Sequence, residues 1–174
     1  MVHGTSHYLR QAWKKPSREM MKERLIEWRA SDAIVKVEKP LRLDRARALG
    51  YKAKKGVVVL RVRVNRGGRK RPRARTKGRK TTKMTNRKVL KMSYRWVSEM
   101  RAARKYPTLE VLNSYLIGKD GKHAFHEVIM IDTARPEIKK DRTLGWIVNG
   151  KNKKRAERGL TSAAKISRGM KRKK

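Results

Sequence analysis

The sequence predicts an α+β fold, with a small and mostly antiparallel four-stranded sheet in a βαβαββ-like order, packed with helices. Alternating or wholly apolar runs predict the strands, and apolar residues at helical spacing predict the helices. Two segments rich in Lys and Arg are expected to lie outside the packed body. They are a long basic loop at about 65–84 and an extended basic C-terminal tail at about 151–174. The length of 174 residues suits one domain, so we expect residues 1–174 to form a single domain.

The N-terminal region predicts helices. In residues 17–30, Met21, Leu25 and Trp28 recur at i, i+4 and i+7, so they share one face of an amphipathic helix. Ser17 stands at the expected N-cap position. The preceding segment SHYLRQAW predicts a shorter helix.

The next elements alternate strand and helix. Residues 33–37 predict a short strand, and residues 43–50 predict a short helix with Asp44 at its start and Gly50 at its end, positions that these residue types favour. VVVLRVRV at 57–64 is the strongest strand. Its even-numbered residues form an apolar face, and its other face, which carries Arg61 and Arg63, is expected to meet an anion.

The second half adds a helix and a hairpin. Residues 85–105 predict a long helix that ends before Pro107, with an apolar stripe of Val89, Trp96, Met100 and Ala103. Residues 109–117 and 123–132 then predict two strands joined by the turn Gly118-Lys119-Asp120-Gly121. Because both strands are apolar on both faces, we expect both faces to be covered.

The charge balance indicates a polyanionic partner. The chain has 51 Lys and Arg against 14 Asp and Glu, a formal net charge of +37. Between Arg45 and Ser98 there is no acidic residue, and residues 151–174 hold eleven Lys and Arg against one Glu. Such a charge opposes compaction, and a bound polyanion would relieve it.

Two kinds of polyanion could bind such a chain, nucleic acid and an anionic membrane surface, and the sequence favours nucleic acid. A membrane surface normally requires an apolar helical face or a lipid anchor beside the charge. The chain has no Cys for lipidation, no Gly at position 2, no apolar run of membrane-spanning length and no secretory apolar region at its N-terminus. We therefore expect no membrane partner.

The candidate sites for catalysis or metal binding are all weak. TKGRKTT at 76–82 lacks the glycine spacing of a phosphate-binding loop. His123 and His126 would point to opposite faces of a strand, and His3 and His7 have no further obvious ligands. The acidic residues are scattered along the chain, and no nucleophile motif is present. We expect no enzyme activity, metal, cofactor or small-molecule substrate.

The basic loop favours structured RNA. It is richer in Arg than in Lys, and Arg can clamp a phosphate and stack on a base. Gly67, Gly68 and Gly78 allow close approach of the backbone. Helix-turn-helix, zinc-finger and basic-zipper motifs for DNA are absent, and two basic extensions on a compact body fit the crevices of folded RNA. Two alternatives stay open, a chromatin-like DNA-compacting protein and an RNA-processing enzyme or its basic cofactor.

Four blocks carry a resemblance to one family. LGYKAKKG (49–56), RVRVNRGGRKRPR (61–73), LEVLNSYLIGKD (109–120) and RGLTSAAKISRG (158–169) occur in order along essentially the whole chain. They resemble ribosomal protein fifteen of the archaeal and eukaryotic large subunit, the "e" type, and the short chain suggests an archaeal-type member. Residues 73–85 and 150–159 depart from that family's usual pattern, so the path of the loop does not follow from the resemblance.

The resemblance implies a structural component of the cytoplasmic large ribosomal subunit, which binds large-subunit rRNA, lies beside other ribosomal proteins and supports translation. It also implies an α/β body with a small antiparallel sheet. The four Trp residues are expected in the core more often than stacked on bases. The residues expected to bind rRNA are Arg61, Arg63, Arg66, Gly67, Gly68, Arg69, Lys70, Arg71, Arg73, Arg75, Lys77, Arg79, Lys80 and Lys83 in and before the loop, and Arg155, Arg158, Lys165 and Arg168 in the tail.

Overall fold

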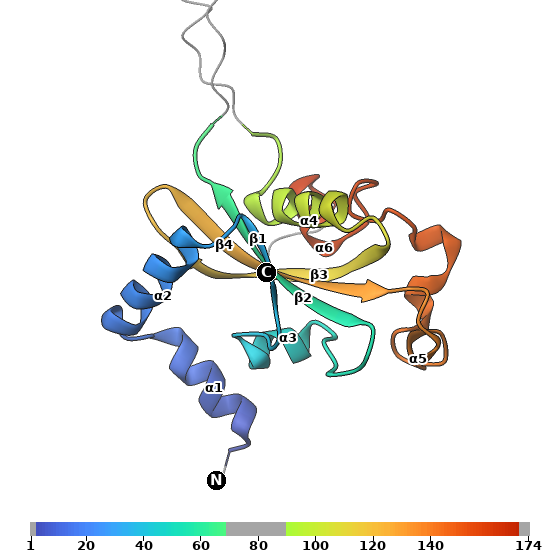
Figure 1. The fold of residues 1–174 in the computed structure, drawn as a ribbon, viewed down its shortest axis with the longest axis horizontal. Coiled ribbons are helices and arrows are strands. Elements are labelled where there is room, and N and C mark those ends of the chain that lie inside the picture. Colours follow the sequence, from blue (N-terminus) through green and yellow to red (C-terminus); the bar gives the residue numbers. More distant parts are fainter. Residues whose placement is uncertain (1–2, 69–89, 171–174) are drawn as a thin grey trace, which may run out of the picture.

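A four-stranded antiparallel sheet organises the protein, as Figure 1 shows for the computed structural model, which describes residues 3–68 and 90–170. The strands are β1 (Ile34–Val37), β2 (Val57–Asn65), β3 (Leu109–Lys119) and β4 (His123–Asp132). Their order in the sheet is β1-β2-β4-β3, and every neighbouring pair is antiparallel. The predicted α+β class and the βαβαββ-like chain order are confirmed.

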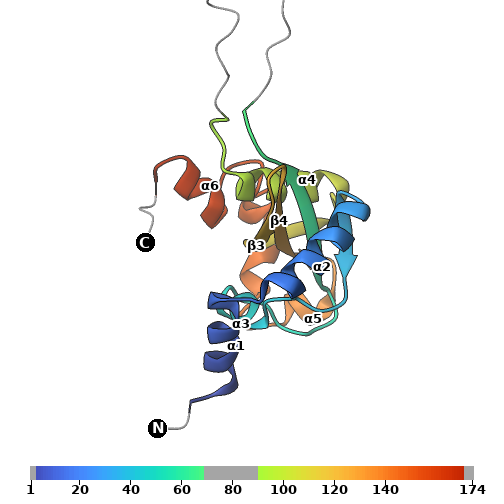
Figure 2. The same cartoon turned by 90° about the vertical axis from the view of Figure 1, so that its left-hand side faces the viewer.

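Six α-helices and two 3₁₀-helices of the described residues surround this sheet. They are α1 (Thr5–Lys14), α2 (Arg18–Ala30), α3 (Leu43–Ala48), α4 (Tyr94–Lys105), α5 (Pro136–Lys139), α6 (Ser162–Ser167), η2 (Gly145–Val148) and η3 (Gly150–Asn152). Ser17 caps α2 as predicted, because its hydroxyl accepts a hydrogen bond from the backbone N–H of Met20. α1 and α2 form an arm at one side of the sheet (Figures 1 and 2).

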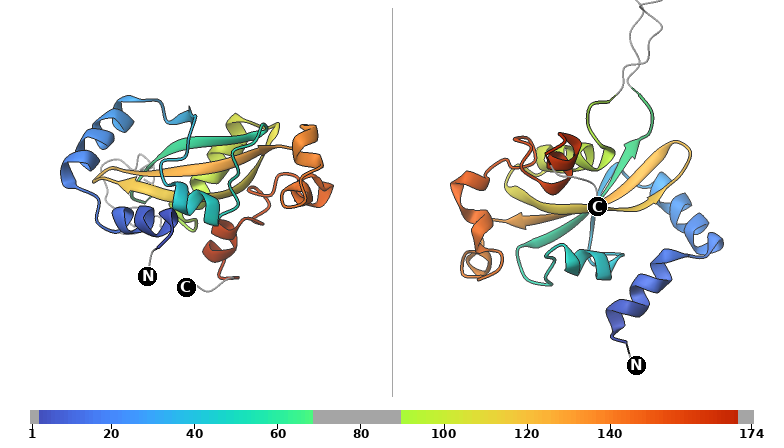
Figure 3. Two further views of the ribbon diagram at one scale, coloured as in Figure 1. Left: turned by 90° about the horizontal axis from the view of Figure 1, so that it is seen from below. Right: turned by 180° about the vertical axis from the view of Figure 1, so that it is seen from behind.

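Both faces of the sheet are covered, which explains why the strands of the hairpin do not alternate. On one face, α2, α3, α5 and η2 pack around Phe125, Ile129 and Ile131 of β4. On the other face, α4 and the C-terminal segment pack around Val62, Val128 and other residues of β2 and β4. Figure 3 shows the helices on both sides of the strands. β4 is central in the sheet and is buried over almost its whole length.

Gly118 lets α2 approach the sheet closely. A Cβ atom at this position would lie 3.0 Å from Cζ3 of Trp28 and 3.2 Å from Cε of Met21. Leu25 contacts the same position, so the three residues predicted to share one face of α2 do so, and they meet the sheet at a residue without a side chain. The strand is irregular here, with a register shift between Leu116 and Gly118 that fits a β-bulge.

The hairpin turn follows the prediction at Asp120 and Gly121, but Gly118 and Lys119, which we expected in the turn, extend strand β3. A carboxylate oxygen of Asp120 accepts hydrogen bonds from the backbone N–H groups of Lys122 and His123. This side chain therefore replaces backbone partners at the tip of the hairpin.

The start of the long helix differs from the prediction. We expected it to begin near residue 85, but α4 begins at Tyr94, and the described residues 90–93 are not helical. The reason is a helix cap, because the Ser93 hydroxyl accepts a hydrogen bond from the backbone N–H of Trp96. Val89 of the predicted stripe lies outside the described residues, and the fully buried positions of α4 are Ser98, Glu99 and Ala102.

The C-terminal segment also differs. We expected an extended tail without a core, but the chain through Met170 folds back on α4 and β3 (Figure 1). Ala156, Ala163 and Ala164 are buried, and α6 is capped by the hydroxyl of Thr161. Small side chains allow this close packing, and buried polar contacts stabilise it where large apolar side chains are scarce.

Candidate nucleic-acid interface

The basic loop leaves and re-enters the body at one place. The chain leaves β2 through Arg66, Gly67 and Gly68, and the described chain resumes at Leu90 before α4. The backbone N–H of Gly67 donates to the hydroxyl of Tyr94, the first residue of α4, at 2.7 Å. Figures 1 and 2 show the end of β2 beside the start of α4.

The exit from β2 is fixed to the hairpin tip. The backbone N–H of Arg66 donates to the carbonyl of Lys122 at 2.7 Å, and its guanidinium donates to the carbonyl of Asp120. Gly67 follows with φ at +108°, a conformation that side-chain-bearing residues rarely adopt. Hydrogen bonds to the hairpin tip therefore fix the end of the strand, and a turn that glycine favours follows it.

Arg61 and Arg63 lie under α2. The guanidinium carbon of Arg61 is 5.6 Å from the centre of the Trp28 ring, its Nη1 lies 3.3 Å from a carboxylate oxygen of Glu27, and its Nη2 donates to the Ser31 hydroxyl at 3.1 Å. The guanidinium of Arg63 donates to the carbonyl of Arg29. The polar face of β2, which was expected to meet an anion, thus holds a helix in place.

Arg155 is built into the fold. It is only 9% exposed, and its Nη1 donates to the carbonyls of Val111 and Leu112 at 2.7 and 2.8 Å. Its guanidinium carbon lies 4.9 Å from the ring centre of the half-exposed Trp146. Burial lowers its pKa, although two glutamates nearby oppose this shift. Arg155 therefore supplies donors to the backbone of the edge strand β3.

The other predicted tail residues lie nearer the surface. Arg158 is exposed and donates to the carbonyls of Lys151 and Lys153. Arg168 is exposed beside Gly159, and Lys165 is half-buried on α6. The loop residues from Arg69 to Lys83 lie outside the described residues.

The tail helix meets the return point of the loop. The backbone N–H of Ser93 donates to the Ser167 hydroxyl at 3.0 Å, and that hydroxyl lies 3.4 Å from the carbonyl of Lys91. Figure 2 shows α6 next to the start of α4. The two basic segments, far apart in sequence, are therefore anchored to neighbouring parts of the body.

A buried polar cluster under α4 was not predicted from the sequence. Glu99 is fully buried and accepts hydrogen bonds from the hydroxyls of Ser114 on β3 and Thr161 before α6. Burial raises the pKa of Glu99, while these hydrogen bonds and two nearby arginines oppose the shift. Beside it, the Ser98 hydroxyl lies 3.0 Å from Nδ1 of the buried His126. The cluster ties the tail to the sheet.

The four Trp residues lie in different surroundings. Trp28 is buried, and Trp96 donates from Nε1 to the carbonyl of Ala156 at 2.8 Å. Trp13 is half-buried beside the guanidinium groups of Arg24 and Arg42. The prediction that tryptophans lie in the core is confirmed for Trp28 and is wrong for Trp146, which is exposed.

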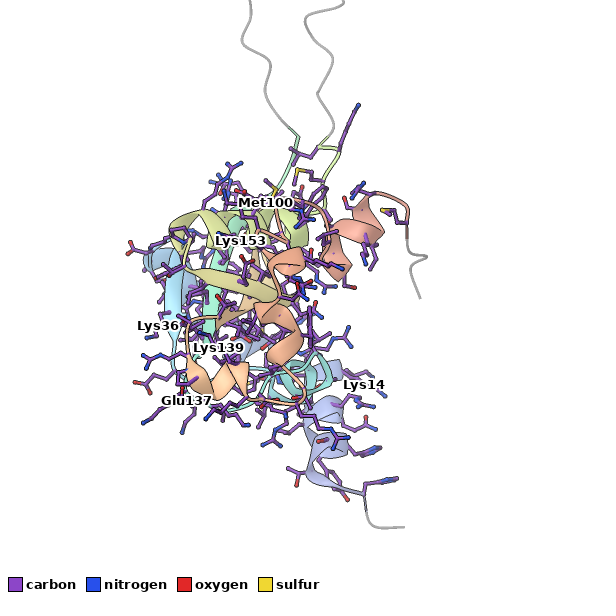
Figure 4. All side chains as sticks on the ribbon, turned by 90° about the vertical axis from the view of Figure 1, so that its right-hand side faces the viewer. Lys14, Lys36, Met100, Glu137, Lys139 and Lys153 are labelled. Atoms are coloured by element: carbon purple, nitrogen blue, oxygen red, sulfur yellow. The ribbon has the colours of Figure 1, made fainter. Side chains whose placement is uncertain are left out.

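Within residues 3–68 and 90–170, no group of three or more His, Cys, Asp or Glu side chains is arranged to hold a metal ion. The helices of these residues include none that is long and apolar enough to cross a bilayer. Lysine side chains instead extend from many elements, including Lys14 on α1, Lys36 on β1 and Lys153 in the C-terminal segment (Figure 4).

Comparison with known proteins agrees with the sequence resemblance. The family model described as Ribosomal L15 (Ribosomal_L15e) matches residues 4–174. The chain is 49% identical over 178 residues to "Large ribosomal subunit protein eL15" of Methanocella arvoryzae, covering 99% of this chain and 90% of that protein. It is also 49% identical over 177 residues to the protein of the same name from Methanospirillum hungatei, with the same coverage.

Proposed function

The chain belongs to the Ribosomal L15 family of the "e" type, and we propose that it binds folded large-subunit rRNA through its two basic segments. It is a structural constituent of the large ribosomal subunit in the cytoplasm and not an enzyme. Its partners are rRNA and other ribosomal proteins. The further proposal concerns which residues make the RNA contacts and how they are presented.

The observation that carries this proposal is the hydrogen bond between Ser93 and Ser167. It sets the return point of the basic loop beside the last helix of the basic tail, so positive charge from both segments can act on one region of RNA. The exposed residues Gly68, Arg168 and Gly169 at the segment boundaries leave both exits open to a partner.

The mechanism follows from charge. Closely packed RNA helices bring phosphates together, and Arg and Lys side chains neutralise this repulsion and release condensed counterions. The proposed contacts in and before the loop are Arg66, Gly67, Gly68, Arg69, Lys70, Arg71, Arg73, Arg75, Lys77, Arg79, Lys80 and Lys83, and those in the tail are Arg158, Lys165 and Arg168. In this proposal Arg61, Arg63 and Arg155 act mainly by supporting the body, because their guanidinium groups contact α2 and β3.

The test is the salt dependence of binding to a large-subunit rRNA fragment. The variant replaces Arg69, Lys70, Arg71 and Arg73 by Ala. Each lost phosphate contact should reduce the slope of log K against log salt concentration by about 0.7–0.9, so the slope should fall by roughly 3. A control variant loses the same number of charges at the exposed Lys36, Lys39, Lys139 and Lys140, away from the two segment exits.

The control should retain most of the slope, and circular dichroism of both variants should match the unmodified chain. An unchanged slope in the loop variant would contradict the proposal. Duplex DNA of equal length at matched salt completes the test, since a DNA-compacting protein would bind it as tightly as the rRNA.

A further inference from the structure

A groove lies at the outer edge of the sheet, where Tyr115 and Leu116 of the last strand, β3, meet residues of α1, α3 and α4. It has a volume of about 660 Å³, within the range of about 300–1,000 Å³ that holds small ligands. Its polar lining comes from four elements and contains Arg10 of α1, Arg42, Asp44 and Arg45 at α3, Arg95 of α4 and Tyr115 of β3. None of these residues belongs to the basic loop or the tail.

The groove has an excess of positive charge. Among its described lining residues, four guanidinium groups face one carboxylate, that of Asp44. Oδ2 of Asp44 lies 3.9 Å from Nη2 of Arg42, so this acid offsets one cation at most. Burial lowers the pKa of Arg95, and while Glu99 opposes the shift, the positive charge of Arg45 adds to it. These arginines are held together against their mutual repulsion, which an anion in the groove would relieve.

Two of the guanidinium groups are oriented by the fold. Arg95 donates from Nε to the Ser114 hydroxyl at 3.0 Å and from Nη2 to Oδ1 of Asn113 at 2.6 Å. The guanidinium carbon of Arg42 lies 5.2 Å from the ring centre of Trp13, and its Nη1 lies 3.4 Å from the carbonyl of Leu116. Side chains fixed in this way lose little entropy when they bind a ligand.

The groove also contains donors that the described part of the chain does not satisfy. Nε of Arg42 is buried and has no hydrogen-bond partner there. The side chains of Arg10 and Arg45 are exposed, and their guanidinium groups form no hydrogen bond or ion pair with other described residues. A phosphate, with several acceptor oxygens, is the kind of ligand that such a set of guanidinium groups binds.

A ligand in the groove would affect how α1 is held against the body. This helix has no buried residue, and it contacts the body mainly near α3. Figure 1 shows α1 and α3 on the far side of the sheet from the exit of the basic loop, and Figure 3 shows α1 beside α3 from below. An anion bound between Arg10 and Arg45 would join α1 to the body.

We propose that this arginine groove holds one nucleotide of the RNA chain, with its phosphates bound by Arg10, Arg42, Arg45 and Arg95. This inference rests on the proposed RNA-binding function and adds a second contact, remote from the loop and the tail. Binding there holds α1 against the body, so the chain contacts RNA at two sides of its sheet.

The test uses adenosine 3′,5′-bisphosphate, which carries the two phosphates that flank a nucleotide in RNA. The full chain is titrated in a buffer free of phosphate, and NMR follows the Nε–H signals of its arginines. The signals of Arg42, Arg45 and Arg95 should shift together, and adenosine without phosphates should shift none of them. Arg45→Glu should weaken binding at least about tenfold, the loss expected for a hydrogen bond to a charged group.

Arg47→Glu is the matched control, because Arg47 lies on the same helix, is also exposed and does not line the groove. It should change binding less than about threefold, a difference below 1 kcal/mol. An equal loss of affinity in both variants, or NMR shifts spread over all exposed arginines, would contradict the proposal that the groove binds a nucleotide. If the chain still binds rRNA with the predicted salt slope in that case, the groove alone is wrong and the proposed function stands.

Discussion

The backbone N–H of Ser93 donates to the hydroxyl of Ser167 at 3.0 Å, across 74 residues of sequence. Ser93 is also the cap of α4, so the same residue ends the return of the basic loop, starts the helix and receives the tail. Two regions that look independent in the sequence therefore share one attachment point. The arrangement explains how a chain with little apolar material can present two basic segments together.

Thr161 should be a major anchor of the tail. Its hydroxyl caps α6 and donates to the buried Glu99. Thr161→Val keeps the shape and removes both roles, so the free energy of unfolding should fall by about 2–4 kcal/mol, the sum of a lost cap and an unsatisfied buried acceptor. Urea unfolding measures this change, and trypsin should cut faster after Arg168.

Ser17→Ala is the control for Thr161, because Ser17 caps α2 and is exposed, with no buried partner. It should cost about 1 kcal/mol. If Thr161→Val costs no more than this control, the contact with Glu99 does not stabilise the tail.

Gly118 should resist even a small side chain. A methyl group there would meet the Trp28 ring at 3.0 Å, tighter than nine in ten such contacts, and the ring would have to shift, so Gly118→Ala should lower the free energy of unfolding by roughly 1–3 kcal/mol. Gly121→Ala in the hairpin turn is the comparison, since no atom lies within 4 Å of its Cβ position. Thermal unfolding of both variants gives the difference, and equal midpoints would show that α2 does not pack closely on β3.

His126 should make the protein less stable in mild acid. Burial, together with the charge of Arg95, lowers the pKa of His126 from 6.5 to about 4, so the folded chain keeps this ring neutral. Between these two values the unfolded chain binds the proton more readily, and the free energy of unfolding falls as the pH falls. The full loss is on the order of 3 kcal/mol.

The comparison of wild type with His126→Asn isolates this effect. Glu99 and Glu127, whose pKa values burial raises, contribute with the opposite sign in both chains. Urea unfolding at several pH values should show a steeper loss of stability between pH 6.5 and 4 in the wild type. Parallel curves for the two chains would refute the role of His126.

Local signals in the sequence predicted most of the body. Three of these signals depend only on neighbours in the chain, and each is confirmed. They are the alternation of Val58, Leu60, Val62 and Val64, the Asp-Gly turn, and the cap at Ser17. The start of α4 was wrong because apolar spacing continues before Ser93, while the cap and its partner Ser167 decide where the helix begins.

The folding of the tail depends on distant contacts. Its average composition is basic and poor in large apolar residues, which is typical of an extended segment. The tail is held by Thr161, Arg155 and several small alanines. The partners of these residues lie on α4 and β3. Glu99 was an available signal, since it is the first acidic residue after Asp44 in a long basic stretch.

The candidate interface was predicted in part. Periodicity places Arg61 and Arg63 on the polar face of β2, but it does not reveal that Trp28 and α2 cover that face. The arginine groove combines α1, α3, α4 and β3, so no single stretch of sequence contains its pattern.

The most direct test of the central claim is sedimentation of a cell lysate through a sucrose gradient, with and without a wash in roughly 0.5–1 M salt. Such salt screens exposed charge within a few ångströms. The account predicts that the protein travels with the large subunit and remains there after the wash, because folded RNA encloses its basic segments. Recovery at the top of the gradient, or together with DNA, would contradict it.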